Sequence, residues 1–279
     1  MIAFIVVCTV GCFFAQTAKP SDPATVAAEN DRIKAQNAAM QKALEAGNLA
    51  ISKKDYDGAI DIYDAAINAD PTHPGLPLVL VNKAYAQMSR GTEVYNMGIA
   101  NNDNAVRDTA KYYFQVAADT TAKAVTLARS LNYTGVQLYS VLLMRKNAMQ
   151  LFTSRVDLSA TADAGTAYNN YLAVETDPAK QEKGRVELGE LFTFVGDGPK
   201  AKAEFEKVLA ASPKNTAALF GFAFSLLTIG SEHDDKVLYQ QSANYFKAFL
   251  DMAPANDLKR NDAIDSLALL KTSYNTVPK

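Results

Sequence analysis

The chain has 279 residues, and its 28 Lys and Arg nearly balance its 30 Asp and Glu, for a formal net charge of -2 at pH 7. We therefore do not expect a general nucleic-acid binder, because such proteins need a basic surface that releases counterions from the phosphates. The two cysteines, Cys8 and Cys12, lie near the start of the chain and there are only two histidines, which disfavours a soft-metal site or a redox pair in the body of the protein.

Residues 2–15 form a run of apolar or small residues, IAFIVVCTVGCFFA, and the first charged residue is Lys19. A run of this length suits the apolar region of a secretory signal peptide and is short for a bilayer span, which needs roughly 20 residues. We predict that residues 1–18 are an export signal. The rest of the chain is then expected to be periplasmic, secreted or lipid-anchored in a bacterial envelope.

Three fates of this signal stay open. A general signal peptidase would cleave near Ala15 or Ala18. Residues 9–12, Thr-Val-Gly-Cys, resemble a degenerate bacterial lipobox, in which Cys12 would carry the lipid. Otherwise the segment is retained as a weak anchor. Contact with a membrane is therefore expected only through this N-terminal lipid or signal.

Beyond Pro23 the sequence changes to helical periodicity. Ala, Glu, Lys and Gln dominate from Ala24 to Lys54, and apolar or small residues recur there every three or four positions. No segment shows the sustained alternation of a strand, so we predict an all-α chain. Helix-breaking residues predict the ends of about eleven helices, with breaks at 54–55, 70–75, 101–104, 132–135, 157–159, 177–178, 196–199, 212–213, 230–235 and 254–256.

Residues 47–71 read GNLAISKKDYDGAIDIYDAAINADP, and their spacing resembles the tetratricopeptide repeat. A repeat of that family has 34 residues in two antiparallel helices, with small residues at positions 8, 20 and 27, aromatic residues at 17 and 24, and a proline at 32. At positions 8, 17, 20, 24, 27 and 32 this chain has Gly47, Tyr56, Ala59, Tyr63, Ala66 and Pro71.

The same spacing returns in the second half of the chain. In residues 182–215, positions 8, 20, 24 and 32 hold Gly189, Ala201, Phe205 and Pro213. The following repeat fits only if about seven extra residues are allowed around 232–236. The resemblance is strong at 40–75 and 182–254 and weak at 76–160, where long helices are predicted at 78–99, 105–131 and 136–152.

The resemblance implies a right-handed superhelical solenoid of antiparallel helix hairpins. Small residues let the helices approach, aromatic residues fill the space beside them, and stacking of neighbouring hairpins completes the core. We predict one continuous body over 19–279, with an irregular middle at 76–160 and a helix at 257–274 that caps the C-terminal end.

Partners of this family usually lie in a concave groove, lined by the first helix of each repeat at positions 2, 5, 9, 12 and 13. The resemblance thus implies that a protein or extended peptide binds there, and the candidate groove residues are Leu44, Asn48, Ile51, Val186, Glu190, Thr193, Phe194, Phe220, Phe224 and Leu227. The family's carboxylate clamp is not expected, because only Asn48 and Lys183 resemble it. The phenylalanines indicate either an apolar groove floor or rings that pack against the adjoining helix.

No catalytic, cofactor-binding or metal-binding site is predicted. Residues 196–201, GDGPKA, match a dinucleotide-binding pattern, but a predicted helix rather than a strand precedes them. His73 and His233 lie in predicted loops, where solvated side chains are expected. Residues 101–104 lack the spacing of a calcium loop, and Asn102 or Asn104 is expected to cap the next helix instead.

These patterns together predict an exported, non-enzymatic scaffold for protein–protein interaction, with a use in assembling cell-envelope complexes. Two alternatives stay open. The irregular middle at 76–160 would form a small-molecule pocket in a solute-binding or accessory protein. An enzyme would need a buried cluster of carboxylates, such as Glu175, Asp177 and Glu187, with perturbed pKa values.

Overall fold

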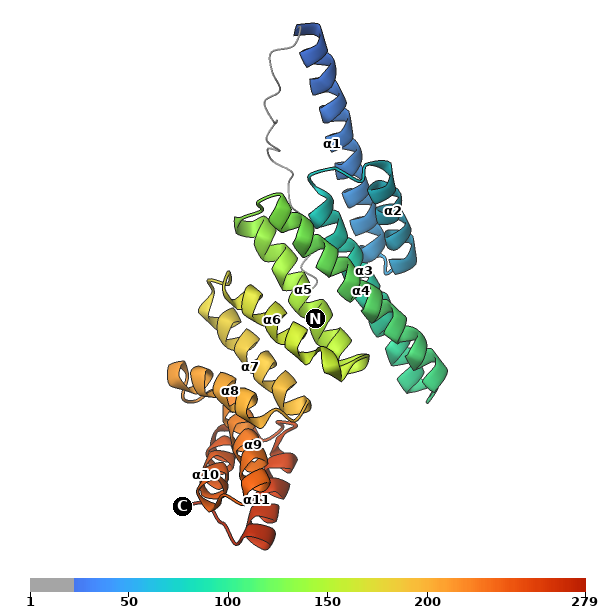
Figure 1. Ribbon diagram of the computed structural model, residues 1–279. Coiled ribbons are helices and arrows are strands. Elements are labelled where there is room, and N and C mark those ends of the chain that lie inside the picture. Colours follow the sequence, from blue (N-terminus) through green and yellow to red (C-terminus); the bar gives the residue numbers. More distant parts are fainter. Residues whose placement is uncertain (1–22) are drawn as a thin grey trace. The chain divides into compact units, whose positions relative to one another are not determined.

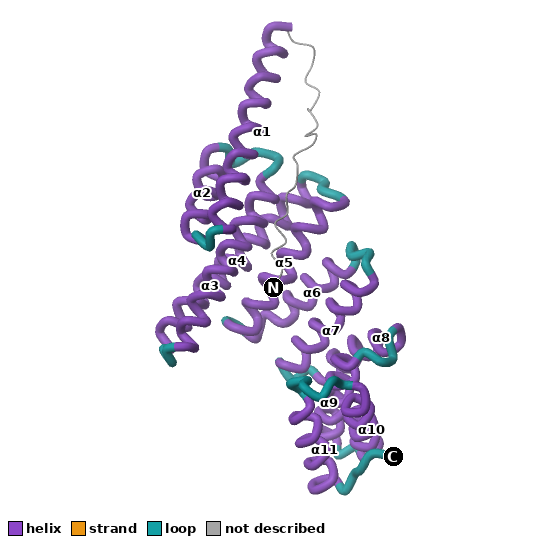
Figure 2. Tube along the Cα trace, turned by 180° about the vertical axis from the view of Figure 1, so that it is seen from behind, coloured by secondary structure: helices purple, strands orange, loops and turns teal. Residues whose placement is uncertain are grey.

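The computed structural model describes residues 23–279, and every regular element in that range is helical (Figures 1 and 2). The predicted export signal, with Cys12, lies outside the described residues. The chain divides into two compact units, Met1–Ala160 (unit 1) and Thr161–Lys279 (unit 2). The single continuous body over 19–279 stays a prediction. Within each unit consecutive helices pack as hairpins, so the all-α fold of stacked helix hairpins is confirmed. No helix of the described range is both long and apolar enough to cross a membrane.

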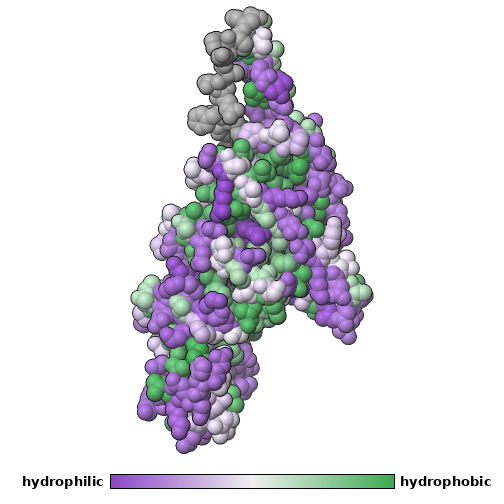
Figure 3. Space-filling view, in the orientation of Figure 1, coloured by the Kyte–Doolittle hydropathy of each residue, from purple (hydrophilic) through white to green (hydrophobic). Residues whose placement is uncertain are grey.

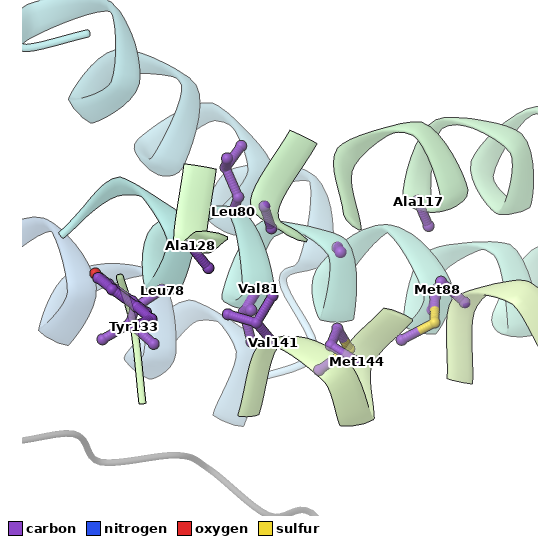
Figure 4. Packing of buried hydrophobic residues seen from close by; sticks show 12 residues of the cluster. Leu78, Leu80, Val81, Met88, Ala117, Ala128, Tyr133, Val141 and Met144 are labelled. Carbon is purple, nitrogen blue, oxygen red and sulfur yellow. The ribbon is translucent and has the colours of Figure 1, made fainter. Parts of the chain in front are cut away.

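Within its described residues, 23–160, unit 1 has five α-helices followed by a short 3-10 helix at Leu158–Ala160. The helices are α1 (Pro23–Ser52), α2 (Tyr56–Ala69), α3 (Leu76–Ala100), α4 (Asn104–Ser130) and α5 (Gly135–Arg155). The long helices expected at 78–99, 105–131 and 136–152 are therefore present as α3, α4 and α5. Their shared core contains Val81, Met88, Val141 and Met144, which Figure 4 shows between the ribbons of these helices.

The α3–α4 turn is capped differently from the prediction. Asp103 is the N-cap of α4, and its carboxylate accepts hydrogen bonds from the backbone N–H groups of Ala105 (2.9 Å) and Val106 (3.2 Å). A carboxylate at this position satisfies free N–H groups and favours the positive end of the helix dipole. Asn102 instead has a φ of 51°, the left-handed conformation that Asn tolerates after a helix end.

Unit 2 contains six α-helices joined by short turns. They are α6 (Thr161–Leu172), α7 (Pro178–Phe194), α8 (Gly198–Ala211), α9 (Thr216–His233), α10 (Lys236–Met252) and α11 (Arg260–Tyr274). On the face seen in Figure 3, hydrophobic and hydrophilic residues are interspersed, as expected for amphipathic helices whose apolar sides face inward.

The helices of unit 2 approach closely where a glycine faces an aromatic ring. The buried ring of Phe205 on α8 lies between Gly189 on α7 and Gly221 on α9. A Cβ atom added at Gly189 would lie 2.7 Å from Cζ of Phe205, and one added at Gly221 would lie closer still. The same ring thus lies against three helices, and the repeat spacing predicts its approach to Gly189 but not its approach to Gly221.

The extra residues around 232–236 lengthen helices instead of forming a loop. Helix α9 continues to His233, Asp234 takes the left-handed conformation that ends it, and Asp235 is the N-cap of α10. The predicted break at 230–235 is thus reduced to two residues. Gly230 lies within α9, and a Cβ atom added to it would lie 3.0 Å from Cδ1 of Tyr239 on α10.

The last helix begins at Arg260, three residues later than the predicted Asp257. The guanidinium Nη1 of Arg260 donates hydrogen bonds to the backbone carbonyls of Leu250 and Ala253, both at 2.9 Å. The Asp257 carboxylate accepts from the N–H of Lys259 at 2.8 Å, which holds residues 257–259 in a turn. These bonds fix the connection between α10 and α11.

We predict that Gly221→Ala lowers the free energy of unfolding by about 1–2 kcal/mol. The overpacking against Phe205 is expected to exceed the gain in helix propensity of roughly 1 kcal/mol. Urea unfolding followed by circular dichroism measures the change. The control is Gly165→Ala, where the added Cβ would lie 3.5 Å from Phe192, an ordinary contact, and no loss of stability is expected. Equal losses at both positions would show that the close approach to Phe205 does not limit this helix packing.

Candidate partner-binding surface

The predicted groove residues of the first hairpin are mostly built into the core. Leu44 and Ile51 on α1 are buried in a cluster that also contains Val79 of α3. Asn48 is half-buried, and its Oδ1 accepts a hydrogen bond of 2.9 Å from the hydroxyl of Tyr63. This hairpin therefore leaves little of the predicted set open to a partner, because α3 covers the apolar members.

The corresponding residues of unit 2 divide into buried and exposed members. Val186 on α7 and Leu227 on α9 are buried. Phe194 is 60% exposed and Phe224 is 37% exposed. Glu190 is exposed, and Thr193 is half-buried with its hydroxyl donating to the Gly189 carbonyl at 2.9 Å.

Phe220 connects this surface to the core. Its ring lies 5.7 Å from Phe246 and 5.3 Å from Phe249, both in edge-to-face geometry, and 6.4 Å from Phe224 in a stacked geometry. Such aromatic pairs hold ring orientations fixed. Of the two interpretations of the phenylalanines, packing against the adjoining helix applies to Phe220, whereas Phe194 and Phe224 keep open faces.

One contact shows that the exposed parts of α7 and α9 belong to one surface. The ammonium of Lys259 lies 2.6 Å from Oε1 of Glu190 on α7 and 5.3 Å from the ring centroid of Phe220 on α9. Phe194 and Phe224 each follow one helical turn later, at i+4 from Glu190 and Phe220. We call the surface formed by Glu190, Thr193, Phe194, Phe220 and Phe224 the α7–α9 face.

Sequence reasoning missed Lys259. The residue lies outside the repeat positions that line a groove, in the turn before the last helix, and its partner Glu190 is 69 residues away. No local pattern in the sequence indicates such a contact. The turn also borders an open depression of about 380 Å³, which is lined by Thr216, Ala217, Phe249 and residues 256–259.

The charges on and beside the α7–α9 face neutralise each other. Glu190 pairs with Lys259, and Lys183 on α7 lies 3.8 Å from the carboxylate of Glu187, one turn along the same helix. The face therefore presents aromatic carbon and paired charges instead of a block of one sign, and it does not resemble a clamp for acidic groups.

The carboxylates considered for an enzyme have structural contacts. Glu175 is buried and accepts hydrogen bonds from the Tyr171 hydroxyl (2.6 Å) and the Asp177 N–H (2.9 Å). Asp177 is the N-cap of α7 and accepts from the backbone N–H groups of Ala179 and Lys180. Among residues 23–279, no three His, Cys, Asp or Glu side chains gather in a way that would hold a metal ion.

Residues 196–199 follow helix α7, as predicted: the first two lie in the turn that joins it to α8, and the last two begin α8. Gly196 has a φ of 79°, which favours glycine, and the side chain of Asp197 accepts from the N–H of Lys200 at 3.1 Å. This is a helix-to-helix turn with an acidic N-cap. An acidic cap repels the phosphates that a dinucleotide-binding turn holds at the same place.

His73 differs from the solvated loop residue that we expected. Its side chain is buried in the turn between α2 and α3, and Nδ1 accepts a hydrogen bond of 2.9 Å from the Gly75 N–H. The proton of the neutral ring is therefore on Nε2, which donates to Oδ1 of Asn37 on α1 at 3.0 Å. Burial lowers the pKa of His73, against a smaller opposing effect of Asp70. His233, by contrast, is an exposed residue at the end of α9.

Comparison with known proteins identifies the repeat. The tetratricopeptide repeat family model matches residues 43–73, which confirms the repeat predicted at 40–75. No curated protein sequence matches the chain.

Three solved structures of similar chains cover most of this protein at low identity. MamA has a TM-score of 0.49 at 16% identity, covering 78% of this chain and 98% of its own. The TPR2AB domain of yeast Sti1, in complex with pHSP90, has a TM-score of 0.38 at 14% identity, with coverages of 85% and 100%. A tetratricopeptide repeat protein from Parabacteroides merdae has a TM-score of 0.28 at 14% identity, with coverages of 84% and 99%.

We predict that the protein loses stability as the pH falls from 7 to 5 and that His73 contributes to this loss. The folded state holds His73 neutral, so the unfolded state, with a histidine pKa near 6.5, binds more protons below that pH. The stabilisation is present above about pH 6.5 and is lost as the pH falls towards the lowered pKa of the folded state. Urea unfolding at each pH measures the change.

The variant that tests this is His73→Asn, whose side-chain oxygen can still accept from the Gly75 N–H but does not titrate. Its stability is expected to depend less on pH between 5 and 7 than that of the wild type. His233→Asn is the matched control and should keep the wild-type dependence. An unchanged pH dependence in His73→Asn would contradict the assignment.

Proposed function

We propose that this chain, a protein built with tetratricopeptide repeats, is a non-enzymatic scaffold that binds an extended, uncharged apolar segment of a partner protein on the α7–α9 face. Proteins with this repeat bind protein partners through the surfaces of their stacked hairpins. The observation that carries the proposal is the exposure of Phe194 and Phe224 on adjoining helices of unit 2. Exposed aromatic side chains of this kind are typical of sites where partners bury apolar groups.

The chemistry of the partner follows from the charges. Glu190 and Lys259 form one ion pair, and Lys183 and Glu187 form another, so an acidic or basic segment finds no unpaired opposite charge among these four. An apolar segment needs no charged partner to cover the rings of Phe194 and Phe224. Binding by burial of aromatic surface is therefore favoured over recognition of a carboxylate.

Export is part of the proposal and rests on the sequence of residues 1–18. The protein would act in the periplasm, outside the cell or on a lipid anchor, where scaffolds of this kind assemble envelope complexes. Mass spectrometry of the mature protein from its own envelope tests this. A mature start at Gln16 or Lys19 supports cleavage by a general peptidase, and a diacylated Cys12 supports the lipoprotein. An unprocessed protein recovered from the cytoplasm would overturn export.

We predict that apolar peptides selected by display on the immobilised full-length protein lose at least about ten-fold in affinity in Phe224→Asp and in Phe194→Asp. Removing an aromatic anchor from an interface costs about 2 kcal/mol or more, and a buried carboxylate adds to this. Fluorescence anisotropy measures the dissociation constants, and circular dichroism checks that the variants fold.

Val237→Asp is the matched control, because Val237 is 65% exposed on α10 and lies outside the α7–α9 face. Its peptide affinity should equal that of the wild type. If the selected peptides bind all three variants equally well, the α7–α9 face is not the binding surface, and if display returns no apolar peptide, the scaffold proposal fails.

A further inference from the structure

The side chain of Lys259 lies across the α7–α9 face. It starts from the turn between α10 and α11, passes over the ring of Phe220 on α9, and ends at the carboxylate of Glu190 on α7. The three contacting residues come from three separate segments of unit 2. The ammonium at 5.3 Å from the ring centroid and 2.6 Å from the carboxylate oxygen is held by both a cation–π contact and a charged hydrogen bond.

The turn that carries Lys259 is itself fixed to the helices. The Asp257 carboxylate accepts from the Lys259 N–H, and the guanidinium of Arg260 donates to two carbonyls at the end of α10. The backbone of Lys259 is therefore held in place from both sides. Only its side chain needs to rotate to uncover the face, and lysine has the rotatable bonds to do so.

Lys259 covers Phe220, which we call the inner end of the α7–α9 face because its ring packs against the core of unit 2. Phe220 lies beneath the ammonium, and Phe224, one helical turn further, is partly exposed. A ligand that lies along Phe194 and Phe224 meets Lys259 where it would reach Phe220. Charged pairs with exposed side chains contribute little to stability, so this one opens at small cost.

We propose that Lys259 is a strap that closes the inner end of the α7–α9 face in the free protein, and that a ligand gains access to Phe220 only when the Lys259–Glu190 pair opens. The inference concerns the regulation of the surface in the proposed function and rests on it. Because the pair is solvent-exposed, salt screens it and opens the strap. A higher ionic strength weakens binding at most charged interfaces. On the α7–α9 face we expect the opposite, namely tighter binding of an apolar ligand as the salt concentration rises.

The test uses the full-length protein and the uncharged, environment-sensitive dye Nile red, which fluoresces when it binds apolar surface. Glu190→Gln removes the partner charge, and Lys259→Ala removes the strap. Both variants should bind the dye about two- to five-fold more tightly than the wild type at low salt, as expected for the loss of an exposed pair. The wild type should approach the variants as sodium chloride is raised to 0.5 M, roughly the range in which the Debye length falls well below 10 Å.

Two control variants test whether the dye binds at the α7–α9 face. Lys247→Ala breaks the exposed Lys247–Asp251 pair on α10, which has the same 2.6 Å separation, and should leave dye binding unchanged. Adding Phe224→Asp to Glu190→Gln should abolish the gain, because the newly opened surface is then no longer apolar.

Hydrogen exchange gives an independent measurement. The amide of Lys259 should exchange at the wild-type rate in Glu190→Gln, because its N–H stays bonded to the Asp257 carboxylate while only the side chain moves. Faster exchange at this amide would overturn a strap that opens by side-chain rotation alone. The strap is overturned if Glu190→Gln and Lys259→Ala bind the dye with wild-type affinity and salt dependence. If the dye behaves as expected but display yields no apolar peptide, the strap stands and the proposed function fails.

Discussion

The fold depends on one packing constraint, the close approach of helices where a small residue faces an aromatic ring. Gly47 faces Tyr63 in the first hairpin, and Gly189 and Gly221 face Phe205 in unit 2. With no Cβ in the way, the ring fills the space between two backbones, and the helices settle at a fixed distance and angle. The next residues along each helix are thereby assigned either to the core or to the outside. Val186 and Leu227 turn inward, and Phe194 and Phe224 remain outside.

The same rule has different results in the two units. In unit 1 the helix that follows the first hairpin is long and apolar, and it buries Leu44 and Ile51 in the core. In unit 2 no element described in the structure buries Phe194 and Phe224 to a comparable degree. Burial of an aromatic ring is favourable by about 1.5–3 kcal/mol, so such rings left in water are available to a partner. The proposed partner site is built on these two exposed rings of unit 2.

The sequence predicted the helices and the small-and-large pairs well, because both depend on local spacing. The sequence did not predict contacts between residues that are far apart along the chain. It also did not show which of several neighbouring polar residues caps a helix. Asp103 was overlooked as a cap between two asparagines, although a carboxylate is the stronger acceptor for helix N–H groups. The sequence predicts a solvated His73, since no local spacing relates it to Asn37, the residue that its ring contacts in the fold. No local pattern indicates the contacts of Lys259, since they join a turn to two helices that are distant in the sequence.

The shared ring of Phe205 also bears on how unit 2 comes apart. In most stacked-hairpin proteins each hairpin contacts only its neighbours, and the ends can fray one repeat at a time. Here the α7–α8 hairpin and the α8–α9 interface use the same side chain, so α9 cannot separate from α8 without exposing the ring that also holds α7. Loss of one interface therefore weakens the other, and the middle of unit 2 is expected to unfold cooperatively, as a single step.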